Sequence, residues 1–155
     1  MRSWGLAGLA LGLLLGGALR ADEKDGDKEA AVKKDWKRLK GTWEEVRSVA
    51  SGEVVPRKEG KQIATIKDGK LTITVGGKVM SEATLRIDPT TRPKSLDATT
   101  SSGPMKGEVS RAIYEVKGDT LRICWALSEK PRPKTFESKK DSWHVLTIYK
   151  RVKPR

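Results

Sequence analysis

The chain has 155 residues, which suggests a single domain, because most domains contain about 100–150 residues. Its formal net charge is +12, and Cys124 is its only cysteine. A lone cysteine excludes an intrachain disulfide, so the fold must be stabilised by its hydrophobic core.

Residues 1–21 have the composition of a secretory signal peptide. Arg2 gives a positive start, a leucine-rich apolar run follows, and small residues then lead into an acidic stretch. Cleavage is expected after Ala18 or Ala21. The alternative is an uncleaved N-terminal anchor, although the apolar run is shorter than the roughly 20 residues that span a bilayer. We therefore expect export to the periplasm or the outside, with no transmembrane segment in the mature chain.

The positive charge is concentrated towards the C-terminus. Residues 129–155 contain nine Lys or Arg and three acidic residues. Such an excess suggests nucleic acid in a cytoplasmic protein, whereas export favours an anionic envelope component such as a glycan, a lipid head group or an acidic protein. We therefore expect no nucleic-acid partner. The alternative is that the charges only keep a small protein soluble.

Residues 22–30 are expected to be a flexible tail, because they are charged and interrupted by glycine. The pattern becomes helical between residues 28 and 39. Val32, Trp36 and Leu39 are spaced so that they share one helical face. This helix should end near Gly41, and its apolar face should pack against the part of the chain that follows. The predicted domain extends over residues 31–153.

The rest of the chain predicts short strands. Leu71, Ile73 and Val75 alternate with threonines, and the Asp68-Gly69 pair before them is a hairpin signal. We expect strands at 42–49, 63–67, 71–75, 82–87, 95–99, 108–116, 121–127 and 142–152, with a short strand at 135–137 as an option. Eight or nine strands at this spacing predict an antiparallel sandwich or up-and-down barrel. Closure into a barrel would also remove exposed sheet edges.

Five segments support a resemblance to a known family. In chain order they are residues 39–44 (LKGTWE), 88–97 (DPTTRPKSLD), 114–124 (YEVKGDTLRIC), 132–136 (RPKTF) and 145–152 (VLTIYKRV). Together they resemble a small uncharacterised domain family that is expanded in planctomycete bacteria, whose members are often exported and look lipocalin-like. The resemblance implies an all-β fold, a small antiparallel eight- to nine-stranded lipocalin-like β-barrel with a short N-terminal helix. It implies no activity.

The Gly41-Thr42-Trp43 segment is also similar to the Gly-x-Trp signature of lipocalins. In that fold the tryptophan plugs the closed end of the barrel, and a basic residue of the last strand packs across it. The resemblance therefore implies a closure formed by Gly41, Trp43 and a counterpart at Lys150 or Arg151, of which we choose Arg151.

A lipocalin-like barrel suggests a binding site in its interior. Such a site needs a cavity of roughly 300 Å³ or more. The candidate lining residues are Leu71, Ile73, Leu85, Tyr114, Ile123 and Trp125. The alternative is that large side chains, Trp125 among them, fill the interior.

Two functions follow from these expectations. The first is an exported, non-catalytic protein that binds a small apolar or amphipathic ligand in the barrel. The second is an envelope structural or interaction protein that uses its basic C-terminal region on an anionic partner.

Catalytic and metal-binding patterns are absent from the sequence. His144 is the only histidine, and together with Cys124 it does not supply the several ligands that a metal site needs. Cys124 lies in a predicted strand and is expected to be inert. Glu44 and Glu45 should point to opposite faces of a strand unless it is bulged. We expect no enzyme, no catalytic residue, no metal and no cofactor, and the sequence does not determine the oligomeric state.

Overall fold

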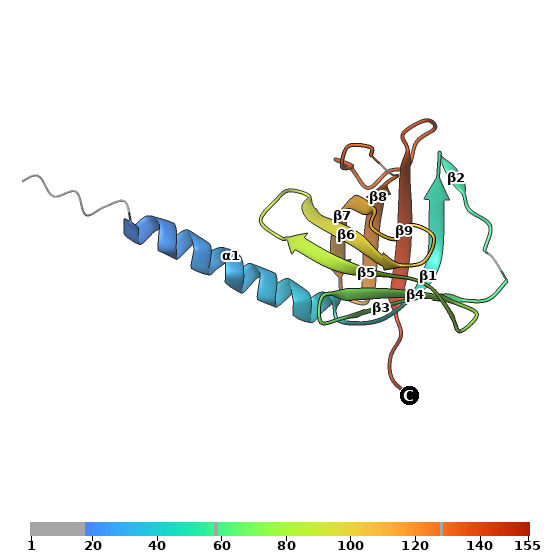
Figure 1. The fold of residues 1–155 in the computed structure, drawn as a ribbon, viewed down its shortest axis with the longest axis horizontal. Helices are drawn as coiled ribbons and strands as arrows, with labels where there is room; N and C mark the ends of the chain where they lie inside the picture. The colour runs from blue at the N-terminus through green and yellow to red at the C-terminus, as the bar shows by residue number, and fades with distance from the viewer. Residues whose placement is uncertain (1–17, 58, 128) are drawn as a thin grey trace, which may run out of the picture.

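The computed structural model describes residues 18–155, apart from residues 58 and 128, as one helix followed by nine strands (Figure 1). The helix is α1 (Ala18–Leu39). The strands are β1 (Gly41–Ala50), β2 (Glu53–Val54), β3 (Gln62–Lys67), β4 (Lys70–Val75), β5 (Lys78–Asp88), β6 (Lys94–Ser102), β7 (Val109–Lys117), β8 (Thr120–Ala126) and β9 (His144–Arg151). Residues 1–17 of the expected signal peptide lie outside the described residues.

The strands form a closed antiparallel barrel. Each of β3 to β8 pairs with the next strand along the chain, and β1 completes the circle by pairing with both β3 and β9. The ninth strand, β2, is a two-residue addition that pairs with the end of β1. The predicted small antiparallel barrel is therefore confirmed. Residues 135–137, considered as a short strand, instead lie in the long segment between β8 and β9.

Helix α1 is longer than the sequence pattern predicts. It includes residues 22–30, which were expected to be a flexible tail. Alanine, lysine and glutamate are good helix formers, and several of them flank Gly26, so helical propensity extends through this stretch. Figure 1 shows the N-terminal half of α1 extending away from the barrel, and its residues from Glu23 to Glu29 are exposed.

The last turns of α1 dock on the barrel as predicted. Leu39 is fully buried in the core, and Val32 and Trp36 pack against it. Asp35 is buried in the same contact and accepts hydrogen bonds from Lys94 Nζ (2.6 Å) and Tyr114 Oη (2.8 Å). The helix therefore covers one end of the barrel, which we call the closed end.

Side-chain size changes along the barrel axis. Near the closed end the inward positions hold large residues such as Trp43, Leu96 and Tyr114, all at most 1% exposed. Two residues further along β6 the inward position is Ala98, and four residues before Tyr114 on β7 it is Ser110. Because side chains alternate across a strand, these small residues face the same interior and leave its other half unfilled.

The segment between β8 and β9 packs on the outside of the barrel. Arg132 Nη1 donates to the carbonyls of Leu96 (3.0 Å) and Ala112 (2.7 Å), and Arg132 Nη2 donates to Asp97 (2.6 Å). Pro133 is fully buried beneath this contact. The outer face of β6 and β7 is thus covered by the chain itself.

Within residues 18–155, no helix combines the length and apolar character needed to cross a membrane.

Candidate functional site

The closed end is sealed by the residues of the Gly-x-Trp segment and the last strand. Trp43 is fully buried, and its Nε1 donates to the Leu39 carbonyl (2.8 Å). The Arg151 guanidinium lies 4.0 Å from the centroid of the Trp43 ring. It also donates to the carbonyls of Arg38 (2.6 Å) and Lys40 (2.9 Å), groups that the end of a helix leaves without intrahelical partners.

Gly41 makes room for this arrangement. A Cβ at position 41 would lie 2.7 Å from Arg151 Nη1, and the backbone has a positive φ of 139°. Lys150, the other basic residue considered for the closure, instead donates to Thr120 Oγ1 (2.6 Å). The structure therefore brings Gly41, Trp43 and Arg151 together.

The opposite end of the barrel contains a cavity of about 470 Å³. Its apolar wall comprises Leu71, Ile73, Val75, Ala83, Ala98, Trp125 and Val145. Its entrance is bordered by Val55, Pro56, Arg57, Gly60 and Lys61 on one side and by Pro104 and Met105 on another. This volume is within the range of small-molecule sites in proteins.

Three of the six predicted lining residues border the cavity, namely Leu71, Ile73 and Trp125. The other three do not: Leu85, Tyr114 and Ile123 are buried in the filled half of the core. All six belong to the interior, but the boundary between filled core and cavity depends on neighbouring residue sizes, which a single strand's pattern does not reveal.

The cavity also has a polar wall, which the sequence patterns did not indicate. It runs along β1 and β9, where Glu45 is opposite Tyr149 and Ser48 is opposite Thr147. The hydroxyl oxygens of Ser48 and Thr147 are 3.4 Å apart. Gln62, from β3, donates a hydrogen bond to Glu45 Oε2. The outcome is an amphipathic interior with one polar and one apolar side.

Glu45 lies at an irregularity of β1. The pairing with β9 shifts register between Glu45 and Arg47, as expected for a β-bulge, which redirects side chains on one strand. Burial raises the pKa of Glu45, and the nearby charge of Arg57 partly offsets this effect. Glu44 instead forms an ion pair with Lys61 at the entrance, with Nζ and Oε2 3.2 Å apart.

Tyr149 adds a second ionisable group to the polar wall. Burial raises its pKa, and the negative charge of Glu45 raises it further. Hydrogen bonds from the side chains of Gln62 and Thr147 act on the pKa in the opposite direction, and the net effect is an increase. Tyr149 therefore remains a neutral hydroxyl at physiological pH, hydrogen-bonded within the polar wall. Its position follows the alternation of Val145, Thr147 and Tyr149 along β9, a signal that the sequence contained.

Arg57 connects the entrance segment to this wall. Its Nη2 donates to the Val46 carbonyl (2.8 Å), at the bulge beside Glu45. Val55 N also donates to the Ser48 carbonyl (2.9 Å). The segment between β2 and β3 is therefore held against β1 and forms one side of the entrance.

Cys124 and His144 lie outside the cavity. The Cys124 side chain is fully buried, its Sγ donates to the Glu137 carbonyl (3.5 Å), and burial raises its pKa to about 11. A thiol with this pKa supplies little nucleophilic thiolate at neutral pH. Among the described residues, no group of three His, Cys, Asp or Glu is placed to hold a metal ion.

No family model, curated protein or solved structure matches this chain. The resemblance to the planctomycete domain family therefore stays a prediction.

Proposed function

We propose that this is an exported, non-catalytic protein that binds a small amphipathic molecule in its barrel. The observation that supports the proposal is the cavity of about 470 Å³, which has an apolar wall and a polar wall. A completely filled barrel would have argued against binding. Export rests on the signal-peptide pattern of residues 1–21.

The polar wall favours a ligand whose head group donates hydrogen bonds. An ionised Glu45 carboxylate only accepts, and it has more lone pairs than the single bond from Gln62 occupies. Gln62 uses an N–H of its amide in that bond and is also hydrogen-bonded to Tyr149, so the acceptor capacity left free for a head group is that of Glu45. An alcohol, amide or amine on an alkyl chain matches this wall better than a carboxylate.

The test is a fluorescence titration with N-phenyl-1-naphthylamine, a neutral apolar probe. Bound probe is then displaced with dodecanol, dodecylamine or dodecanoate at pH 7. We expect the parent protein to bind the probe, and dodecanol and dodecylamine to displace it better than dodecanoate.

A cavity-filling variant makes the test specific. Ala83→Leu combined with Ala98→Leu adds side-chain volume inside the cavity, and we expect it to weaken probe binding by at least about tenfold. The matched control is Ala30→Leu on the exposed part of α1, which should bind like the parent. Equal binding by the filled variant and the parent would contradict the proposal.

The alternative, an interaction through the basic C-terminal region, has weaker support. Several of its cations are used within the molecule: Arg132 binds Asp97, Arg151 seals the closed end, and Lys153 pairs with Asp119. The region also extends from one end of the barrel to the other, because β9 runs between its two parts. Retention of the protein on an anionic matrix, decreasing steeply as the salt concentration rises, would support this alternative.

A further inference from the structure

Exposed apolar side chains gather at the open end of the barrel. They lie on the segments that join strands there: Val54 and Val55 after β1, Met80 at the start of β5, Met105 between β6 and β7, and Leu127 and Trp143 beside the segment from β8 to β9. Trp143 is 54% exposed and Met105 is 47% exposed. Most soluble proteins do not concentrate large apolar side chains on one surface, so such a patch indicates an interaction site.

The joining segments contact one another and make a continuous surface. A Cβ on Gly60 would lie 2.9 Å from the backbone of Gly76, and one on Gly103 would lie 3.0 Å from the Met80 carbonyl oxygen. Gly52 similarly approaches the Lys140 backbone. We call residues 51–57, 59–61, 76–80, 102–108, 127, 129–130 and 138–143 the rim.

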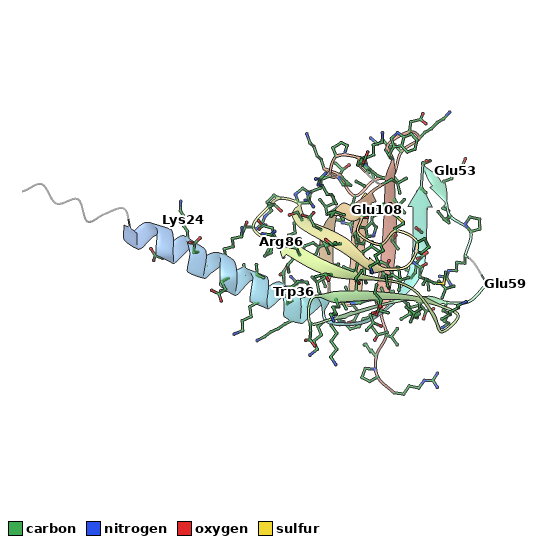
Figure 2. All side chains as sticks on the ribbon, viewed as in Figure 1. Lys24, Trp36, Glu53, Glu59, Arg86 and Glu108 are labelled. Atoms are coloured by element: carbon green, nitrogen blue, oxygen red, sulfur yellow. The ribbon has the colours of Figure 1, made fainter. Side chains whose placement is uncertain are left out.

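Cationic side chains share the rim with the apolar ones. Lys78, Lys106, Lys130 and Lys140 are exposed there. Acidic residues are also present, including Glu108 and, on the side of the barrel away from α1 in Figure 2, Glu53 and Glu59. Over the rim residues the sequence contains seven Lys or Arg and five Asp or Glu, so the rim has a net positive charge.

Trp143 combines an exposed side chain with an unusual backbone conformation. Its φ is +57°, a left-handed conformation that a bulky residue rarely adopts. Lys130 Nζ lies 4.9 Å from the centroid of its ring, which places a cation and an aromatic ring side by side on the rim. Tryptophan prefers the interface between water and lipid, where its apolar body is buried and its N–H stays hydrated.

We propose that the rim docks on the surface of an anionic lipid bilayer, with the cavity entrance facing the lipid. Apolar side chains beside lysines suit this surface, because the former enter the head-group region and the latter attract anionic lipids. Two copies meeting rim to rim would instead bring their lysines together. Val55 and Met105 belong both to the rim and to the cavity entrance, so docking would open the cavity towards the membrane.

The first experiment measures sedimentation with vesicles of phosphatidylcholine containing phosphatidylglycerol, and with phosphatidylcholine alone. The protein is purified from the envelope, and its N-terminus is determined by mass spectrometry so that every variant carries the same one. We expect binding to the anionic vesicles, and weaker binding at high salt or without phosphatidylglycerol.

Rim variants show which surface is responsible. Met80→Ser combined with Trp143→Ser changes two exposed rim residues that do not line the cavity, and it should reduce binding to anionic vesicles by at least about tenfold. Reversing Lys78 and Lys106 to Glu should reduce it by more than about fivefold for each residue. The matched controls are Val152→Ser, an exposed apolar residue near the closed end, and Lys67→Glu in the β3–β4 hairpin; both should bind like the parent.

A second measurement locates the contact. With brominated lipids in the vesicles, Trp143 should be quenched on binding, and the quenched component should disappear in Trp143→Phe. Binding through the N-terminal segment alone would leave Trp143 unquenched. That result would overturn the proposal, as would equal sedimentation of the parent and the rim variant, or rim-dependent self-association without vesicle binding.

Docking and cavity binding can fail separately. The Ala83→Leu, Ala98→Leu variant should still bind vesicles. The Met80→Ser, Trp143→Ser variant should still bind N-phenyl-1-naphthylamine in solution, because neither residue lines the cavity. Loss of only one activity therefore identifies which of the two proposals is wrong.

Discussion

The hydroxyl of Tyr114, in β7, donates a 2.8 Å hydrogen bond to the buried carboxylate of Asp35, in α1. Lys94 Nζ approaches the same carboxylate oxygen at 2.6 Å. Burial and the hydrogen bond to Asp35 raise the pKa of Tyr114, so its hydroxyl remains a donor at any physiological pH. This polar cluster fixes the position of the helix on the barrel, while the apolar residues around it supply most of the contact.

Replacing Asp35 with Ala should destabilise the fold by about 3 kcal/mol, because it leaves a partly buried lysine and a buried hydroxyl without their partner. Asp35→Asn should cost less, since the amide still accepts from Tyr114. Urea unfolding at pH 7 gives both values. The control is Asp27→Ala in the exposed part of α1, which should change the free energy of unfolding by less than about 0.5 kcal/mol. Equal effects at positions 35 and 27 would refute this role.

The contacts of Arg151 at the closed end should contribute a similar amount to the free energy of unfolding. Arg151→Ala removes the contact with Trp43 and leaves the carbonyls of Arg38 and Lys40 without their donor, at a cost of about 2–4 kcal/mol. Arg151→Lys should recover only part, because an ammonium lacks the planar fork that reaches both carbonyls. Lys153→Ala, which breaks an exposed pair with Asp119, is the control and should have little effect on the unfolding midpoint.

The architecture follows from local patterns that the sequence shows directly. Period-two alternation and glycine turns, such as Asp68-Gly69, predict antiparallel neighbours, and the structure has them. The length of α1 was missed because charged residues at 22–30 were expected to be mobile, although they have high helical propensity.

The cavity was predicted less completely, for a physical reason. Period two identifies which residues face inward, but not how far along each strand the interior is filled. That boundary is set by contacts across several strands. For example, Leu96 fills the barrel interior, whereas the smaller Ala98, two residues further along β6, borders the cavity. Glu45 faces the cavity by simple alternation with Trp43, whereas Ser48, three residues later, reaches the polar wall because the β1–β9 pairing shifts register between Glu45 and Arg47. No sequence pattern predicted the position of that bulge.

Acid should weaken the contact between α1 and the loop after β5. Hydrogen bonds from the Thr90 hydroxyl and backbone N–H, and then from Lys28, lower the pKa of Asp88 from 3.8 to about 2. Because the pKa of Asp88 is lower in the folded state than in the unfolded state, the ionised carboxylate stabilises the fold at pH values above about 3.8. This stabilisation is lost as the pH falls from about 3.8 to about 2.

An NMR titration of the Asp88 carboxyl tests this directly. Thr90→Val removes the hydroxyl and keeps the backbone N–H, so the pKa of Asp88 should move only part of the way back to its ordinary value. Asp88→Asn should flatten the acid limb of the unfolding free energy. An unchanged pKa in Thr90→Val would show that the hydroxyl is not responsible.

Glu45 gives the opposite pH dependence and also tests the proposed ligand chemistry. Because burial raises its pKa in the folded state, its protonation favours folding at low pH, and this contribution is lost as the pH rises through the raised pKa. Glu45→Gln should therefore increase stability at neutral pH and remove this pH dependence. Urea unfolding between pH 4 and 8 measures both effects.

The same variant should change which amphiphile binds. Without the carboxylate, dodecylamine should displace N-phenyl-1-naphthylamine about tenfold less well, since a charge-assisted hydrogen bond is lost, whereas dodecanol should compete much as before. Glu44→Gln is the matched control: it removes a neighbouring carboxylate that pairs with Lys61 at the entrance, and it should leave the order of competitors unchanged. If Glu45→Gln and the parent show the same preference among the three competitors, Glu45 does not recognise the head group, and the polar wall must act through Gln62 and Tyr149.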